Sequence, residues 1–431
     1  MAVAPDAERV GPVDGPARLA GVELTALRNV RLLDGSLADL DLAAGEITAV
    51  RAAAGTPVAE TDSGTDASGW RLIPAAGEPH AHLDKALSAE QIEPGPQAGN
   101  DLVTAIEQWR SLVPTLTSDD FADRARRAVR RYVANGITTI RTHADALLAG
   151  DPLRGVDALL GLREELSGTV TLQVCLLAGQ DVPDAVIEDA IGRGIDIIGG
   201  CPHLADEPAK ETSRILDHAE RSGLPVDLHT DEQTTTGHLD LADLAEQVIA
   251  RGMSQRVTAS HCVRLGMLDH DRRGPVVDLV AKAGIGIVTL PITNLYLQGR
   301  DVDGAVPRGL TAVRALLEAG VPVAAGADNL RDPFNPVGRA DPFETTSLLV
   351  AAGHLRPAEA LAAVTTTTRT VLGLPDAGTV PGSRADFMLV PDVPLDEVVA
   401  GSQTARVVVH GGRVLADTRV STVLDLDPMP R

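Results

Sequence analysis

One stretch decides how this sequence folds: Glu78-Pro79-His80-Ala81-His82-Leu83-Asp84-Lys85. His80 and His82 stand one residue apart at the end of an apolar run that begins at Trp70. Alternate side chains of an extended strand project to the same side, so both imidazoles can reach one metal ion. Such pairs also occur by chance, and most isolated histidines are surface or satisfied core residues. The metal interpretation therefore depends on where the other histidines and carboxylates fall.

The composition is that of an ordinary globular chain with an acidic surface. Its 431 residues, 44% of them hydrophobic, allow two or three domains, or one barrel with an accessory unit. A formal net charge of −22 argues against nucleic-acid or anionic-membrane partners, which require clustered Lys and Arg. Three cysteines cannot form a disulfide framework for a chain of this size, which favours a reduced setting. Met1–Ala20 has no apolar core segment, so we expect a loose tail without a signal or membrane span, and a cytoplasmic protein.

The sequence pattern at both ends of the chain predicts a small β domain. Residues 24–50 alternate in short runs separated by Asp-Gly and Ala-Gly turns, a pattern typical of β-hairpins. Residues 385–390 and 405–414 show the same texture. We therefore expect residues 21–71 and 376–431 to pair into one composite β-sandwich domain.

The middle of the chain alternates short apolar strands with amphipathic helices, which indicates βα units and a parallel sheet. Eight strands are predicted, at residues 72–82, 137–144, 170–177, 196–202, 226–230, 257–261, 286–291 and 323–328. Helices are predicted between them, for example at residues 121–134, 184–193, 209–221, 241–250 and 312–319. An open nucleotide-binding sheet is disfavoured, because no Gly-x-Gly-x-x-Gly turn follows the first strand and there is no P-loop. The pattern predicts that residues 72–375 form a (β/α)8 barrel.

Polar residues gather at the predicted carboxyl ends of the barrel strands, where barrel enzymes place their chemistry. Six of the eleven histidines fall there: His80, His82, His143, His203, His229 and His261. Core packing does not explain this placement, because barrel interiors are filled mainly by branched aliphatic residues. His80, His82, His229 and Asp328 make a plausible ligand set for one divalent ion with an open position for water.

Glu232 is the predicted proton shuttle. It follows His229 by three residues, where it can take a proton from activated water and pass it to a leaving nitrogen. A carboxylate that stabilises a helix N-terminus is the alternative, but Glu232 lies too far before the helix at 241–250. His261 is a further candidate at the rim of the site. His143 and Asp145 are weaker candidates, since such residues often orient a metal ligand instead. For His203 and Gln180, substrate contact and structural use are equally open.

With these residues in view, the chain resembles the amidohydrolase superfamily, and within it the cytosine deaminase group. The resemblance covers residues 72–386 and is carried by Glu78-Pro79-His80-Ala81-His82-Leu83-Asp84, Arg141-Thr142-His143-Ala144-Asp145, Leu228-His229-Thr230-Asp231-Glu232, Val257-Thr258-Ala259-Ser260-His261, Asn294-Leu295-Tyr296-Leu297-Gln298-Gly299-Arg300, Gly326-Ala327-Asp328-Asn329 and Asp332-Pro333-Phe334-Asn335-Pro336. It implies metal binding by the four residues named above, with Asp328 also part of the catalytic set. It further implies that Glu232 shuttles the proton and that His261 polarises or orients the attacking water. Gln180 lies one residue from a glutamine position that reads the pyrimidine edge in the family.

Departures from the family pattern bear on the metal and on the substrate. Cys201-Pro202-His203 stands where binuclear members carry a bridging lysine or glutamate, which favours a single zinc or iron ion. Asn329 replaces the second of two successive aspartates and Phe334 replaces a tryptophan, so both are candidate substrate contacts together with His203. An asparagine offers a donor and an acceptor, which favours a ring that turns a carbonyl or bare nitrogen toward it. A lysine at position 85 is a point of similarity to the s-triazine N-alkylaminohydrolases of the same group. The alternative is that Lys85 forms an ion pair with a neighbouring acid.

The first functional hypothesis is a metal-dependent deaminase that releases ammonia from an amino-substituted nitrogen heterocycle other than cytosine. The alternatives are hydrolysis of a cyclic amide, cyclic amidine or N-alkylamine by the same activated water, and a catalytically silent barrel used for binding. The Cys-ligated zinc deaminases are excluded, because their His-x-Glu and Pro-Cys-x-x-Cys signature is absent from the sequence. The expected partner is a small heterocycle, and a homo-oligomer is compatible with the sequence. The choice of metal, the heterocycle, and whether Lys85, His143 and Asp145 contact substrate stay open at this point.

Overall fold

The structure is a computed structural model that describes residues 9–10, 18–58, 62–92, 101–300 and 302–423 of the chain. These residues divide into two compact units. The β unit contains the described residues up to Ala75, Ala134–Gly136 and those from Ala377 onward, and the barrel unit contains the described residues of 76–133 and 137–376. Most of the predicted tail, Met1–Ala20, lies outside the described residues. Leu19 is buried in the core of the β unit, so its part of the tail is packed.

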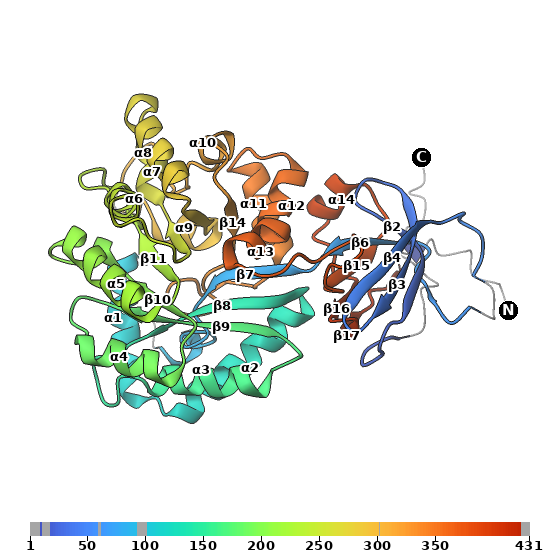
Figure 1. Cartoon of the computed structure of the whole chain (residues 1–431), viewed down its shortest axis with the longest axis horizontal. Helices are drawn as coiled ribbons and strands as arrows, with labels where there is room; N and C mark the ends of the chain where they lie inside the picture. The colour runs from blue at the N-terminus through green and yellow to red at the C-terminus, as the bar shows by residue number, and fades with distance from the viewer. Residues whose placement is uncertain (1–8, 11–17, 59–61, 93–100, 301, 424–431) are drawn as a thin grey trace, which may run out of the picture. The chain divides into compact units, whose positions relative to one another are not determined.

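The barrel unit contains eight parallel strands, each paired with its neighbour in the sequence (Figure 1). They are β7 (Ala76–Ala81), β8 (Ile137–Asp145), β9 (Thr171–Ala178), β10 (Ile197–Gly200), β11 (Val226–Thr230), β12 (Val257–His261), β13 (Gly286–Thr289) and β14 (Val323–Ala325). A bridge between Ala81 and Asp328 links the first strand to the turn after the last one, which nearly closes the ring. The predicted (β/α)8 barrel is confirmed.

Helices surround these strands (Figure 1). They are α1 (Leu102–Leu112), α2 (Ser118–Ala134), α3 (Arg154–Glu165), α4 (Asp184–Arg193), α5 (Pro208–Ser222), α6 (Asp240–Arg251), α7 (Val263–Met267), α8 (His270–Ala283), α9 (Pro291–Leu297), α10 (Val313–Glu318), α11 (Pro342–Ala351), α12 (Pro357–Val364) and α13 (Thr366–Leu372). Helix α2 shows why they form: Phe121, Ala125, Val129 and Tyr132 recur on one face and are buried, which is the spacing of an amphipathic helix. Gly223 ends α5 with φ 77°, a left-handed conformation that glycine adopts without steric cost. None of the helices in the described ranges has both the length and the hydrophobicity needed to cross a bilayer.

The first predicted strand, residues 72–82, is divided between the two units. β6 (Trp70–Pro74) pairs antiparallel with β15 (Phe387–Pro391) in the β unit, and β7 begins only at Ala76. Both segments are buried throughout, so the apolar run is continuous and carries no sign of the break. Within β7 the register shifts between Glu78 and Ala81, around Pro79, which has no amide hydrogen for the ladder.

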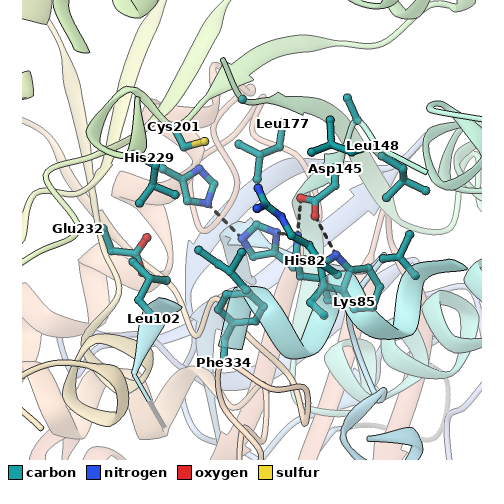
Figure 2. A pocket seen from close by; sticks show the side chains of 18 of the residues that line it. His82, Lys85, Leu102, Asp145, Leu148, Leu177, Cys201, His229, Glu232 and Phe334 are labelled. Carbon is teal, nitrogen blue, oxygen red and sulfur yellow. Dashed lines mark hydrogen bonds and ion pairs between the residues drawn. The ribbon is translucent and has the colours of Figure 1, made fainter. Parts of the chain in front are cut away.

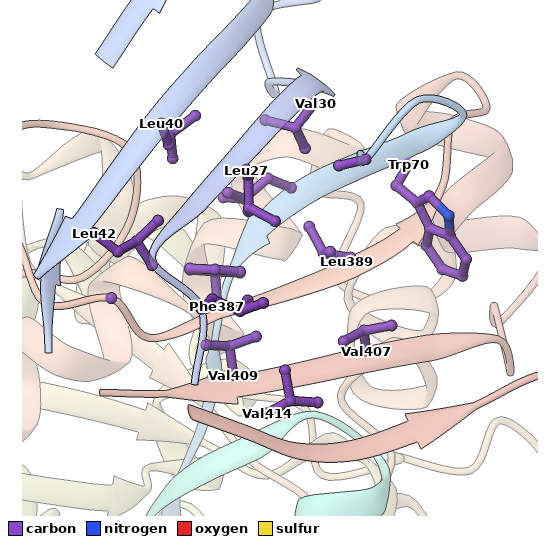
Figure 3. Packing of buried hydrophobic residues seen from close by; sticks show 14 of the residues in the cluster. Leu27, Val30, Leu40, Leu42, Trp70, Phe387, Leu389, Val407, Val409 and Val414 are labelled. Atoms are coloured by element: carbon purple, nitrogen blue, oxygen red, sulfur yellow. The ribbon is translucent and has the colours of Figure 1, made fainter. Parts of the chain in front are cut away.

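The β unit joins both ends of the chain in one mixed sheet of strand order β17-β16-β15-β6-β2-β3-β4, with β5 beside β2. The further strands are β2 (Ala26–Arg31), β3 (Leu37–Ala43), β4 (Glu46–Ala52), β5 (Thr65–Asp66), β16 (Arg406–His410) and β17 (Arg413–Thr418). Helix α14 (Leu395–Ala400) connects β15 to β16, and β1 (Arg9–Val10) pairs with β18 (Thr422–Val423). Leu40 of β3 and Val414 of β17 belong to the same buried cluster, so strands from opposite parts of the sheet share one core (Figure 3).

Asp386 is a buried carboxylate that holds the C-terminal strands of the β unit together. Its oxygens accept from Gly411 N at 2.7 Å and Arg384 Nε at 3.1 Å, and His410 Nδ1 lies 3.2 Å away. Burial alone would raise the pKa of Asp386, but His410, the Gly411 amide and Arg384 outweigh it and hold the pKa well below its usual range.

We expect Asp386→Asn to lower the free energy of unfolding by about 1–3 kcal/mol at pH 7, because it weakens charge-assisted bonds inside the core. The unfolded carboxyl titrates near pH 4, so the Asp386 contribution is complete above that pH and is lost as the pH falls below it. Urea unfolding at pH 7 and pH 3 measures both effects, and the difference between the two proteins should shrink at pH 3. Equal stability of the two proteins at pH 7 would show that the contacts of Asp386 contribute nothing.

Candidate active site

The carboxyl ends of β7, β11 and β14 bring three histidines and one aspartate together. His80 Nε2 lies 3.0 Å from His229 Nε2, which lies 3.2 Å from His82 Nε2. Asp328 Oδ1 is 3.4 Å from His82 Nε2 and 3.9 Å from His80 Nε2. All four side chains are buried. The structure thus gathers the four predicted metal ligands, which we call the ligand cluster, around one point.

The tautomer of His80 suits a metal ligand. Ser260 Oγ donates to Asp227 Oδ1 at 2.8 Å, so the same oxygen accepts from His80 Nδ1 at 2.9 Å. The proton of the neutral ring is then on Nδ1, and Nε2 turns a lone pair into the ligand cluster. Burial and the neighbouring cationic or imidazole groups lower the pKa of His80, His82 and His229 well below the usual value, so the rings are neutral.

The carboxylate of the ligand cluster completes a cation site. Asp328 Oδ1 has no hydrogen-bond partner among the described residues. Burial raises the pKa of Asp328 well above its usual range, and the nearby carboxyls of Glu232 and Asp332 raise it further. A divalent cation would place positive charge against this oxygen and against the Nε2 lone pair of His80. The residues therefore fit the ion that the sequence predicts.

A buried network below the ligand cluster fixes its geometry. Arg141 NH1 donates to Asp227 Oδ2 at 2.7 Å, and Asp227 accepts from Ser260, which holds His80. His143 does not line the cavity; it stacks on His80 with ring centroids 4.0 Å apart and brings a ring nitrogen within 4.8 Å of ring nitrogens of His80 and His229. Sequence reasoning missed Asp227 and Ser260. The available signal is that Asp227 stands two residues before His229 on β11 and therefore faces the same way.

Left-handed backbone occurs where the strands end. Asp231, His261 and Asp328 have φ values of 54°, 70° and 65°, which are uncommon outside glycine and cluster at functional sites. The turn before Asp328 is held by Glu78, whose Oε2 accepts from Ala327 N at 2.9 Å. A Cβ on Gly326 would lie 1.9 Å from Glu78 Oε1, so a larger residue there would displace the Glu78 carboxylate. These contacts place the Asp328 carboxylate against the histidines of β7.

Glu232 lies beside the ligand cluster with its carboxylate between two imidazoles. Oε1 is 3.6 Å from His261 Nδ1, and Oε2 is 3.7 Å from His203 Nε2. His261 also reaches the cluster, because its Nε2 is 3.9 Å from Asp328 Oδ2, and Asn294 Oδ1 lies 3.0 Å from its Nδ1. Burial raises the pKa of Glu232 to about 8, against the opposing charge of Lys85. The carboxyl can therefore take up and release a proton near neutral pH.

A cavity of about 260 Å³ opens onto the ligand cluster, with Glu232 and the Lys85–Asp145 pair on opposite sides of His82 and His229 (Figure 2). Lys85 Nζ lies 2.6 Å from Asp145 Oδ1 and 3.1 Å from His82 Nδ1. Trp109 of α1 donates to Asp145 Oδ2 at 2.8 Å. Asp145 and Lys85 thus form part of the cavity wall and steady His82.

Helix α1 forms an apolar wall that the sequence analysis missed. Leu102, Ile106 and Trp109 of α1 line the cavity together with Val113, which directly follows the helix, and their spacing is that of one helix face. The signal in the sequence is this periodicity after Asp101, whose side chain accepts from Thr104 N and begins the helix.

Of the four predicted substrate contacts, Asn329, Phe334 and His203 line the cavity. The Asn329 amide donates from Nδ2 to Asp332 Oδ2 at 2.9 Å, which fixes its orientation. Gln180 does not line the cavity: its side chain is exposed and accepts from Asp206 N at 2.8 Å. Its neighbour Gly179 lines the cavity instead, and we do not assign Gln180 a substrate contact.

A barrel with three imidazoles, one carboxylate and a second buried carboxyl group at its strand ends has the architecture of a metal-dependent hydrolase. The chain belongs to the amidohydrolase family, whose sequence model matches residues 108–416. Family members are metal-dependent, and the predicted resemblance to the superfamily is confirmed.

The relatives indicate which class of reaction the enzyme catalyses. A pterin deaminase of Rhizobium rhizogenes is 32% identical over 372 residues, which cover 84% of this chain and 84% of the relative. The structure of a 5-methylcytosine deaminase from Klebsiella pneumoniae, liganded with 5-fluorocytosine, superposes with a TM-score of 0.86 at 28% identity, covering 93% of this chain and 99% of that one. An N-isopropylammelide isopropylaminohydrolase from Burkholderia multivorans reaches a TM-score of 0.75 at 29% identity, covering 91% and 98% of the two chains. The predicted enzyme class, a hydrolytic deaminase acting on carbon–nitrogen bonds, is confirmed.

Proposed function

We propose that this enzyme removes the amino group of a two-ring heterocycle of the pterin type, with one zinc or iron ion held by the ligand cluster. The observation that carries the proposal is the position of Glu232, buried beside the ligand cluster and facing the cavity. The 32% identity to a pterin deaminase over most of both chains supports the substrate class. A cavity of about 260 Å³ is near the lower end of ligand pockets, roughly 300–1,000 Å³, and suits one compact heterocycle.

Different residues of the site bind the substrate and transfer the proton. The rings of Phe334 and Trp109 with the aliphatic side chains of α1 offer apolar walls for a flat ring and exclude water from it. When bound, the divalent ion would supply the positive charge that lowers the pKa of water to about 7. His261, held by Asn294, orients the water, and Glu232 takes its proton. Glu232 then gives a proton to the leaving nitrogen, so that ammonia departs and the oxygen of the attacking water stays on the ring as a carbonyl.

The test is a panel of pterin, 5-methylcytosine and N-isopropylammelide incubated with metal-loaded protein, with ammonia and isopropylamine measured separately. We expect ammonia from pterin at the highest kcat/KM. Isopropylamine release as the fastest reaction would instead support the N-alkylamine hypothesis. No turnover of any compound by protein that holds its metal would count against the deaminase.

Cytosine is expected to be a poor substrate because of Asn329. An ionised aspartate at this position would only accept hydrogen bonds, whereas the asparagine is uncharged and donates to Asp332. A mismatch with one buried polar group costs about 1–3 kcal/mol, so kcat/KM for cytosine should be roughly ten- to a hundredfold lower than for the true substrate. Asn329→Asp should raise kcat/KM for cytosine and lower it for pterin. Efficient cytosine turnover by the unchanged enzyme would show that Asn329 does not read the ring.

A further inference from the structure

His203 lines the cavity and carries a buried ring nitrogen, Nε2. It lies in the short turn Pro202–Leu204 after β10, and its Nδ1 is 3.1 Å from the backbone carbonyl oxygen of His229. A carbonyl only accepts, so Nδ1 carries the proton. In the neutral ring Nε2 then presents a lone pair, and it has no hydrogen-bond partner among the described residues.

This lone pair faces the carboxyl group of Glu232. Nε2 of His203 is 3.7 Å from Glu232 Oε2, the two side chains are 1% and 6% exposed, and both residues line the cavity. That separation is too long for a direct hydrogen bond, so the buried Nε2 lone pair stays unpaired, which is unfavourable. When Glu232 is ionised, one nitrogen at hydrogen-bond distance from both groups can donate to each of them. The arrangement is complete only when such a donor is bound.

The two oxygens of Glu232 face different partners. Oε1 lies toward His261, which reaches Asp328 of the ligand cluster and hence the side where water attacks. Oε2 lies toward His203, away from that side. A carboxyl group that takes up the proton of water on Oε1 must turn about its Cγ–Cδ bond to deliver that proton beside the His203 lone pair.

We propose that His203 binds the amino group that leaves, and thereby selects primary amines over alkylamines. This inference rests on the proposed deaminase function. One N–H of the amino group donates to His203 Nε2 and the other to Glu232. Glu232 then protonates the nitrogen, the C–N bond breaks with its electron pair going to nitrogen, and ammonia leaves; His203 gains and loses no proton. An alkyl substituent would replace one of the two hydrogens and leave one acceptor unpaired.

Two substitutions separate this role from a structural one. The amide of His203→Asn reaches about as far as Nδ1, so it keeps the bond to the His229 carbonyl and loses the acceptor at Nε2. The amide of His203→Gln reaches about as far as Nε2, so it restores an acceptor there and gives up the Nδ1 contact. Metal content and circular dichroism of both variants show whether the ligand cluster and the fold are intact. The substrates are pterin and its 2-methylamino analogue, with ammonia and methylamine measured separately.

We expect His203→Asn to keep its metal and to lose roughly five- to a hundredfold in kcat/KM for pterin, with a much smaller loss for the methylamino analogue. The preference for pterin should therefore collapse in His203→Asn and return in part in His203→Gln. An equal loss for both substrates, or no loss, would overturn the proposal and leave His203 a structural residue.

Failure of the proposed function is recognised separately. If the unchanged protein releases no amine, isothermal titration calorimetry of the same two compounds into the same three proteins still measures binding. A preference for pterin that is present in the unchanged protein, absent in His203→Asn and partly restored in His203→Gln would support the contact of His203 with the amino group without turnover. Equal affinities for both compounds in the unchanged protein would overturn it.

Discussion

Replacing Glu232 with glutamine is expected to lower kcat by about 10²- to 10⁴-fold while the protein stays folded and keeps its metal. The amide is nearly isosteric with the carboxylate but can neither accept the proton of water nor protonate the leaving nitrogen. Burial holds the pKa of Glu232 at about 8, and no other carboxylate lies between His261 and His203 among the described residues. KM should change far less than kcat, because the lost interaction belongs to the chemical step.

Steady-state ammonia release by the two proteins, with metal content measured on the same samples, checks this expectation. Glu246→Gln on α6, an acid outside the cavity, is the matched control and should retain full activity. If Glu232→Gln kept most of the kcat, the proton would have to travel through another group, with His261 or Asp328 next in position.

The second large effect is expected when the ligand cluster loses one member. Zinc sites in small peptides bind with about 10–16 kcal/mol, so one ligand in four represents about 3–4 kcal/mol, or about 10²- to 10³-fold in affinity. His80→Ala and Asp328→Ala should each purify with little metal and little activity. Both residues are buried, so the variants also need a check that they fold.

Elemental analysis and circular dichroism of the purified variants provide the measurement. His238→Ala is the control for losing a histidine, because His238 is on the surface and outside the cavity. A full metal complement in both His80→Ala and Asp328→Ala would show that the ion is held elsewhere.

Much of the barrel could be predicted because its strands are short, buried and bounded by polar residues. The bounds of β11 and β12 coincide with the predicted 226–230 and 257–261; β12 ends at His261, and β11 ends one residue after His229. The division of 72–82 between two sheets could not be predicted, since both β6 and β7 are buried on both faces.

Prediction of the site from the sequence has a similar limit. Histidines at strand ends point to one place once a barrel is assumed, because parallel strands direct their carboxyl ends to the same rim. The partners of Lys85 and the apolar wall of α1 depend on packing between elements far apart in the sequence, such as Trp109 and Asp145. Gln180 illustrates how a shift of one residue at a strand end sends a side chain away from the cavity. The predicted absence of nucleic-acid partners and the homo-oligomer stay predictions.

The most direct test of a metal-dependent deaminase is to titrate metal-depleted protein with zinc or iron while measuring ammonia release from pterin. We predict no activity in the depleted protein and a linear rise that ends at about one ion per chain, as expected for a site with a single set of four ligands. Full activity without metal, or no ammonia at any loading of a protein shown to bind the ion, would contradict it.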